Sequence, residues 1–166
     1  LHKYLAQKFD GKDLVVVSPD VGGLKMASAY SQALGAGLAI VAKRRKSATE
    51  IESLYVIGDV EGKDVLIIDD LTETAGTLTS AAKILKRHGA NTIYAGVSHA
   101  VLSDMAIERL KNSEIVELIT TNSVPVRMGD GVNVKVLCIA ELLGEGIKRI
   151  HNDESVSSLF EINGKK

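Results

Sequence analysis

The 166 residues include 20 basic and 21 acidic side chains, and the resulting net charge of −1 gives no reason to expect nucleic acid or an anionic membrane as partner. Apolar residues make up 45% of the chain and aromatic residues only 4%, which predicts one globular domain with an aliphatic core. No apolar run approaches about 18 residues, so neither a transmembrane helix nor a signal peptide is expected.

Short continuous apolar runs alternate with longer amphipathic stretches along the chain. This alternation predicts an α/β fold, a single three-layer α/β/α domain with a central, mostly parallel sheet. The expected strands cover residues 14–17, 38–41, 53–58, 65–68, 92–97, 115–120 and 134–137, and the expected helices 22–34, 77–88, 103–110 and 139–150. An opening helix carries the apolar stripe Leu1, Tyr4, Leu5 and Phe9, which we expect to pack on this domain's own sheet. The alternative is a contact with a preceding domain.

A polar segment follows the most apolar strand and leads directly into a helix. It consists of Asp69, Asp70, Leu71, Thr72, Glu73, Thr74, Ala75, Gly76 and Thr77. In a parallel sheet this position is the edge where ligands bind, and the free N–H groups of a helix start favour a phosphate. The carboxylates can accept hydrogen bonds from two vicinal hydroxyls. A capping cluster would explain a lone Asp–Thr–Gly, but the longer pattern favours a binding loop for ribose 5-phosphate.

Two more polar segments follow expected strands. The first strand leads into Asp20, Val21, Gly22 and Gly23, and the second into Lys43, Arg44, Arg45 and Lys46. Alone, a Gly-Gly turn usually serves tight packing and a basic run usually faces solvent. At one sheet edge, however, the glycines would let backbone amides converge on an anion, and Asp20 could bind a divalent cation. The basic run could act as a mobile lid over phosphates.

Residues 69–77 resemble the phosphoribosyl diphosphate (PRPP) binding motif of the type I phosphoribosyltransferase fold. With segments 18–23, 41–45 and 154–160, nearly the whole chain is similar to the C-terminal half of the ribose-phosphate diphosphokinase (PRPP synthetase) family. The resemblance implies that residues 1–166 are the C-terminal phosphoribosyltransferase-like domain of a two-domain synthetase, with the N-terminal half absent. A first residue other than Met agrees with this expectation.

The resemblance also implies a role for each loop. Asp69, Asp70 and residues 73–77 would bind ribose 5-phosphate, although Glu73 stands where the family commonly has Asp. Residues 20–23 would bind the diphosphate, and Asp20 would hold Mg²⁺ with help from a histidine of the absent domain. The catalytic residues would be Lys43 and Arg45, followed by Lys46 where the family often has Pro.

The resemblance implies transfer of the diphosphoryl group of ATP to ribose 5-phosphate, giving PRPP and AMP for nucleotide biosynthesis. The implied partners are these two substrates, the absent N-terminal domain and further copies in a dimer-based hexamer. The isolated domain should have little activity. Two alternatives stay open: a complete type I phosphoribosyltransferase that consumes PRPP, although no base-binding hood is evident, and a non-catalytic regulatory subunit.

Two further side chains carry weaker signals. Cys138 is the only cysteine, which leaves no internal disulfide and is compatible with a cytoplasmic protein. We expect it to be buried beside a strand end. His99 should lie at the same sheet edge as the loops, and we expect it to form a hydrogen bond rather than to act in catalysis.

Overall fold

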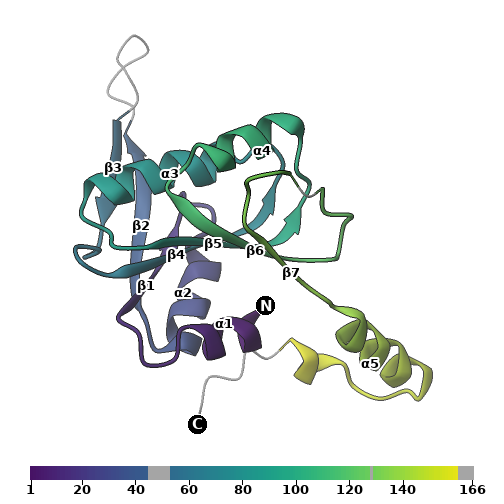
Figure 1. Cartoon of the computed structure of the whole chain (residues 1–166). Helices are drawn as coiled ribbons and strands as arrows, with labels where there is room; N and C mark the ends of the chain where they lie inside the picture. The colour runs from purple at the N-terminus through teal and green to yellow at the C-terminus, as the bar shows by residue number, and fades with distance from the viewer. Residues whose placement is uncertain (45–52, 128, 161–166) are drawn as a thin grey trace.

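The computed structural model describes residues 1–44, 53–127 and 129–160 (Figure 1). It contains a seven-stranded sheet in the order β3-β2-β1-β4-β5-β6-β7. Neighbouring strands are parallel except for the antiparallel pair of β2 with β3 at one edge. The strands are β1 (Leu14–Ser18), β2 (Gly37–Arg44), β3 (Ser53–Ile57), β4 (Asp64–Thr72), β5 (Ile93–Ala100), β6 (Ile115–Thr121) and β7 (Val134–Leu137).

Helices cover both faces of this sheet. One face carries α1 (His2–Lys8) and α2 (Leu24–Leu34), and the other carries α3 (Gly76–Arg87) and α4 (Asp104–Lys111), as Figure 1 shows. The arrangement confirms the predicted three-layer α/β/α domain with a mostly parallel sheet. Among the described residues, no helix is both long and apolar enough to cross a membrane.

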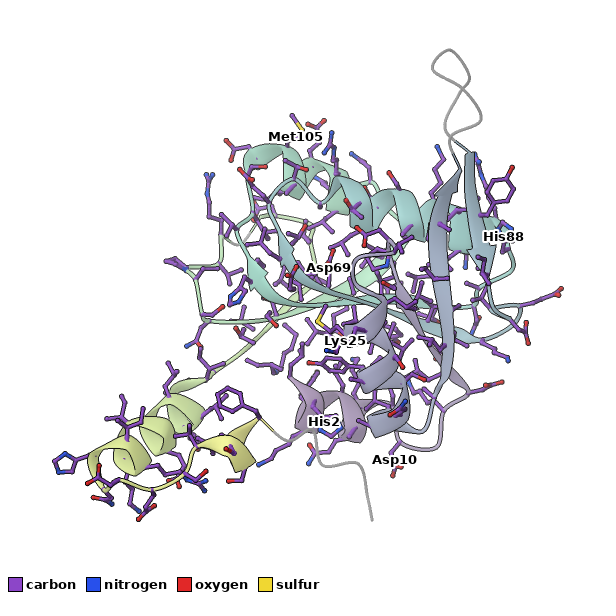
Figure 2. All side chains as sticks on the ribbon, turned by 180° about the vertical axis from the view of Figure 1, so that it is seen from behind. His2, Asp10, Lys25, Asp69, His88 and Met105 are labelled. Atoms are coloured by element: carbon purple, nitrogen blue, oxygen red, sulfur yellow. The ribbon has the colours of Figure 1, made fainter. Side chains whose placement is uncertain are left out.

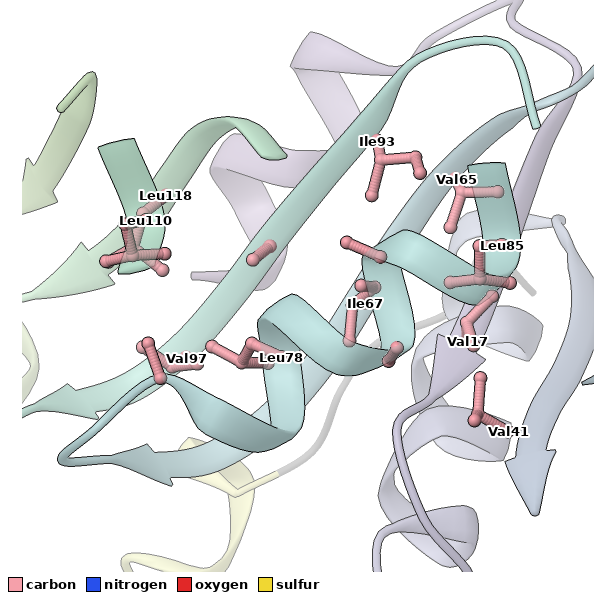
Figure 3. Packing of buried hydrophobic residues seen from close by; sticks show 14 of the residues in the cluster. Val17, Val41, Val65, Ile67, Leu78, Leu85, Ile93, Val97, Leu110 and Leu118 are labelled. Carbon is pink, nitrogen blue, oxygen red and sulfur yellow. The ribbon is translucent and has the colours of Figure 1, made fainter. Parts of the chain in front are cut away.

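The central strands are buried on both faces, which explains their continuous apolar runs. In β4, Val65 and Ile67 pack toward α3, whereas Leu66 and Ile68 pack toward α1 and α2. Figure 3 shows the α3 side, where the helix sets its apolar stripe against the strands. That stripe consists of Leu78, Ala81, Ala82 and Leu85.

The opening helix belongs to this core. Leu5 and Phe9 are buried against the face that carries α2. Leu1 and Tyr4 pack against the same cluster while remaining partly exposed. The expected packing of the apolar stripe on the domain's own sheet is therefore confirmed.

The C-terminal arm, residues 140–160, extends away from the three layers (Figure 1). It contains α5 (Ala140–His151) and the short 3-10 helix η1 (Ser157–Leu159), and neither has a buried residue. Arg149 of α5 joins the two parts, because its guanidinium donates to the hydroxyl of Ser158 in η1 and to the carbonyl of Ser155 at 3.1 Å. The same guanidinium contacts Glu145 within α5 at 2.7 Å. The apolar side of α5 stays exposed at Leu142, Leu143, Ile147 and Ile150.

Two strands extend further than their apolar runs predicted. β4 continues beyond Ile68 because β5 pairs with it, placing Leu71 opposite His99. β2 continues through the first half of the basic run, where Lys43 pairs with Leu54 of β3. These polar segments were predicted to be loops, but backbone pairing with a neighbouring strand keeps them extended.

Candidate functional site

Two adjacent strands bring two of the predicted loops together. β1 and β4 are parallel neighbours, so the turn after β1 and the end of β4 lie at one edge of the sheet. β2 pairs with the other side of β1 in the same direction and is described as far as Arg44. The turn after β1 and the end of β4 line one cavity of about 630 Å³. Its acidic lining consists of Asp20, Asp69 and Asp70. Figure 2 shows Asp69 between the layer of α2, which carries Lys25, and that of α4, which carries Met105.

The two carboxylates of β4 have different surroundings. Asp69 is partly buried and accepts a hydrogen bond from the backbone N–H of Asp70 at 3.0 Å, whereas Asp70 is exposed. Burial raises the pKa of the Asp69 carboxyl, the Asp70 N–H opposes this rise, and the negative charges of Asp70 and Asp20 add to it. The cavity therefore concentrates carboxylates that would be stabilised by hydroxyl donors or by a cation.

The candidate ribose 5-phosphate loop is shorter than predicted. Asp69 to Thr72 belong to β4, residues 73–75 turn the chain, and α3 begins at Gly76. Ala75 has left-handed backbone angles, φ 55° and ψ 13°, and its methyl group is buried. Among the described residues, no protein acceptor takes the N–H groups of Thr74, Ala75 or Gly76. Backbone N–H groups left without an acceptor at a helix start are the kind of donors that bind phosphate.

The side chains around these N–H groups are free to reach a ligand. Glu73, Thr74 and Thr77 are all exposed. A threonine hydroxyl can donate to a phosphate oxygen, so two further donors flank the backbone amides. The predicted members of this loop thus occupy the end of β4, the turn and the start of α3.

The candidate diphosphate loop is closed by its own hydrogen bonds. The buried hydroxyl of Ser18 donates to the carbonyl of Asp20 at 2.6 Å, and the N–H of Gly23 donates to Asp20 Oδ1 at 3.1 Å. A Cβ on Gly23 would lie 2.9 Å from the Ser18 hydroxyl, so the turn needs glycine there for packing. Val21 and Gly22 remain accessible beside it. Ser18 lies in the segment 18–23 that carries the resemblance, but the prediction gave it no role in this loop.

The candidate lid lies mostly outside the described residues. The backbone of Lys43 belongs to β2, but its side chain is not described, and Arg45 and Lys46 fall in the segment 45–52 that the structure leaves out. The catalytic roles expected for Lys43 and Arg45 stay predictions.

The described residues contain no group of three His, Cys, Asp or Glu side chains that could hold a metal ion. Asp20 offers a carboxylate at the cavity, although one of its oxygens already accepts from Gly23. Oxygen donors suit Mg²⁺, which is commonly bound by one or two carboxylates together with substrate phosphates. The donor chemistry at Asp20 fits such a shared site.

His99 and Cys138 give opposite results. His99 Nδ1 lies 2.7 Å from the hydroxyl of Ser123, which confirms the expected hydrogen bond. Cys138 is exposed, so the prediction of a buried thiol was wrong. It follows the edge strand β7, at the point where the chain leaves the three layers for α5.

The fold, with its loops at the carboxyl edge of a mostly parallel sheet, defines an α/β domain of the kind found in a solved phosphoribosylpyrophosphate synthetase. Residues 45–161 match the family model described as "Phosphoribosyl synthetase-associated domain". This match covers more than half of the chain. The chain therefore belongs to the phosphoribosyl synthetase-associated domain family.

Individual relatives agree with this assignment. A ribose-phosphate pyrophosphokinase of Gloeobacter violaceus is 48% identical, with 96% of this chain covering 48% of that protein. One from Caldanaerobacter subterraneus is 47% identical, with 96% of this chain covering 51% of it. The solved phosphoribosylpyrophosphate synthetase of Mycobacterium smegmatis superposes with a TM-score of 0.82 at 34% identity, over 92% of this chain and 49% of that one. The chain thus spans about half the length of the relatives it matches.

Proposed function

We propose that the chain is the C-terminal, ribose 5-phosphate-binding domain of a ribose-phosphate diphosphokinase, with the N-terminal half of the enzyme lying outside residues 1–166. One observation carries this proposal: Asp20, Asp69 and Asp70 line a single cavity at the edge where α3 begins with N–H groups that no described residue accepts. A sugar phosphate presents hydroxyl donors at one end and an anion at the other, which matches this arrangement of acceptors and donors.

In the proposed complex, each end of ribose 5-phosphate meets its own set of groups. Asp69 and Asp70 accept hydrogen bonds from the vicinal ribose hydroxyls. The phosphate lies against the backbone amides of residues 74–77, with the hydroxyls of Thr74 and Thr77 as further donors. Glu73 extends from the turn between these two sets.

The other two loops act on the diphosphate in this proposal. The C1 hydroxyl oxygen of ribose 5-phosphate forms a bond to the β-phosphorus of ATP, while the bond from that phosphorus to the α–β bridging oxygen breaks. AMP leaves with the electron pair, and the hydroxyl proton passes to solvent. Residues 20–23 position the diphosphoryl group, and Lys43 and Arg45 stabilise the negative charge spread over it.

Mg²⁺ is the cofactor that the proposed activity implies. When bound, it supplies positive charge to the diphosphate oxygens. Asp20 would hold it, because its carboxylate faces the cavity and substrate oxygens can complete the coordination.

The complete protein would combine this domain with several partners. The half outside this chain would supply much of the ATP site, so the 166 residues alone should make little PRPP. The full enzyme would be a homo-oligomer of dimers assembled into a hexamer, acting in the cytoplasm. Adding the other half of the enzyme should restore turnover.

Titration calorimetry of ribose 5-phosphate into the 166-residue chain tests the proposal directly. Asp69→Asn and Asp70→Asn should each weaken binding about tenfold or more, equivalent to ~1.4 kcal/mol. The matched control is Asp64→Asn at the opposite end of β4, where Asp64 accepts a hydrogen bond from the Asn91 amide at 2.9 Å. The affinity of this control for ribose 5-phosphate should stay within about twofold of that of the parent, since the effect of one distant charge is screened by salt. Absence of binding by the parent chain would contradict the proposal.

Two assays separate the alternatives. Incubation with PRPP and the common bases should give no base-dependent release of diphosphate, and such release would favour a complete phosphoribosyltransferase instead. In the full-length protein, Lys43→Ala should abolish PRPP synthesis. Unchanged synthesis would favour a regulatory subunit.

A further inference from the structure

The candidate ribose 5-phosphate loop is held from behind by α4. The backbone N–H and the hydroxyl of Ser103 both donate to the carbonyl of Glu73, each at 3.1 Å. The guanidinium of Arg109 donates from Nη1 to the carbonyl of Thr74, also at 3.1 Å. Two consecutive carbonyls of the loop are therefore fixed by one helix that lies 30 and 35 residues further along the chain.

Fixing these carbonyls also fixes the amides that a phosphate would need. A trans peptide is planar, and its carbonyl and N–H point in opposite directions. When the Glu73 carbonyl points to Ser103, the N–H of Thr74 points away from α4. When the Thr74 carbonyl points to Arg109, the N–H of Ala75 likewise points away from α4. Both amides are thus turned outward before any ligand arrives.

The next residue needs such external support. Ala75 adopts left-handed backbone angles, which cost a residue with a Cβ about 1–2 kcal/mol. Its carbonyl is held by Thr79, which donates from its backbone N–H at 3.0 Å and from its hydroxyl at 2.8 Å. Strain of this kind persists only where neighbouring contacts over-determine the conformation. Arg109 and Ser103 hold one side of the strained residue, and Thr79 holds the other.

Arg109 reaches the loop without entering the acidic cavity. Its side chain lines a separate hollow of about 440 Å³ between α3 and α4, together with Thr79, Ser80 and Lys83. The cavity that contains Asp69 and Asp70 does not include it. Packing against Gly76 is close, because a Cβ there would lie 3.0 Å from Arg109 Nη1. Arg109 therefore acts on the backbone of the loop and not on the sugar.

We propose that Arg109, together with Ser103, is a positioning residue that orients the N–H groups of Thr74 and Ala75 toward the phosphate of ribose 5-phosphate. This inference rests on the proposed function of the loop. Preorganised donors bind more tightly because the cost of ordering them is met by folding instead of by binding.

The test compares Arg109→Gln with Arg127→Gln in the 166-residue chain. Arg127 pairs with Asp104 of α4 at 2.9 Å, so its substitution removes the same charge beside the same helix without touching the loop. Calorimetry with ribose 5-phosphate should show about a tenfold loss of affinity for Arg109→Gln and less than about twofold for Arg127→Gln. Arg109→Lys, which keeps a donor and the charge, should recover part of the loss. Equal losses in the two Gln variants, or no loss in Arg109→Gln, would overturn the proposal.

A second measurement needs no ligand and therefore separates this inference from the proposed function. ¹⁵N relaxation should show lower order parameters for the amides of Thr74 and Ala75 in Arg109→Gln, with unchanged values in Arg127→Gln. Thermal unfolding should confirm that both variants fold. Unchanged order parameters in Arg109→Gln would refute the positioning role even if the parent chain binds ribose 5-phosphate. Lower order parameters would support it even if the parent does not bind.

Discussion

The turns after β1 and after β4 follow neighbouring parallel strands, and they are stabilised in different ways. The turn after β1 closes on itself, since Ser18 and Gly23 both bond to Asp20 within a span of six residues. The turn after β4 depends on Ser103 and Arg109, which belong to another helix. The first turn is therefore a local structure that its own sequence specifies. The second exists in its binding shape only when α4 is packed in place, so its geometry depends on the tertiary fold.

The largest expected effect tests the self-contained turn. Gly23→Ala places a Cβ 2.9 Å from the fully buried Ser18 hydroxyl, which already bonds to Asp20. Because this contact cannot relax without breaking that bond, we expect a loss of about 1–2 kcal/mol in the free energy of unfolding, measured by urea denaturation. Gly22→Ala is the matched control, since its Cβ meets only the Asp20 carboxylate at 3.3 Å. Equal losses in both variants would mean that the close contact is not the cause.

The next effect tests the support from α4. Ser103 caps this helix by accepting from the N–H of Ala106 at 3.3 Å while it donates to Glu73. Ser103→Ala removes both bonds and should lower the free energy of unfolding by about 1 kcal/mol. Ser103→Thr keeps the hydroxyl and should recover most of the loss in the same denaturation experiment. A neutral Ser103→Ala would show that the hydroxyl adds nothing beyond the backbone bond.

A smaller stability effect is expected at Gly76, where the obstacle is the end of a flexible side chain. Gly76→Ala should push Arg109 away from the Thr74 carbonyl and weaken ribose 5-phosphate binding several-fold. Its free energy of unfolding should change by less than about 1 kcal/mol, because alanine is also the better helix former. Gly144→Ala in α5 is the control, since its Cβ has open space around it and the site is remote. It should gain stability with unchanged binding, whereas unchanged binding in Gly76→Ala would argue against the role of Arg109.

The subtlest prediction concerns pH. The pKa of Asp69 is raised above 3.8 in the folded chain, so the folded state binds more protons than the unfolded state between these two pKa values. Stability therefore falls as pH rises through this window and then stays constant. Asp69→Asn removes the cost of ionising this carboxyl in the folded chain. The midpoint temperature of its thermal unfolding should therefore match that of the parent below pH 3.8 and exceed it at neutral pH. Parallel thermal melts of the parent and of Asp69→Asn across this pH range measure the gap, and a gap that does not change with pH would contradict the prediction.

The sequence by itself determined the layers of this protein and the chemistry of its loops. Strands buried on both faces require continuous apolar runs, and helices on a sheet require a stripe such as Leu78, Ala81 and Leu85. Both patterns depend on nearby residues, so they could be predicted along the chain. The same holds for the order of polar residues after β1 and β4, which a strand-to-helix turn places at one sheet edge.

Only the tertiary structure decided what depends on distant partners. Pairing with β5 extended β4 to Thr72, and the edge position after β7 left Cys138 exposed. Neither outcome follows from the sequence next to these residues. The hydrogen bond from Arg109 to the carbonyl of Thr74 joins residues 35 positions apart, and no sequence pattern near either residue predicts it. The physical reason is common to all three. Local periodicity specifies which face of an element is buried, whereas strand length, exposure and backbone support depend on which neighbour the fold brings alongside.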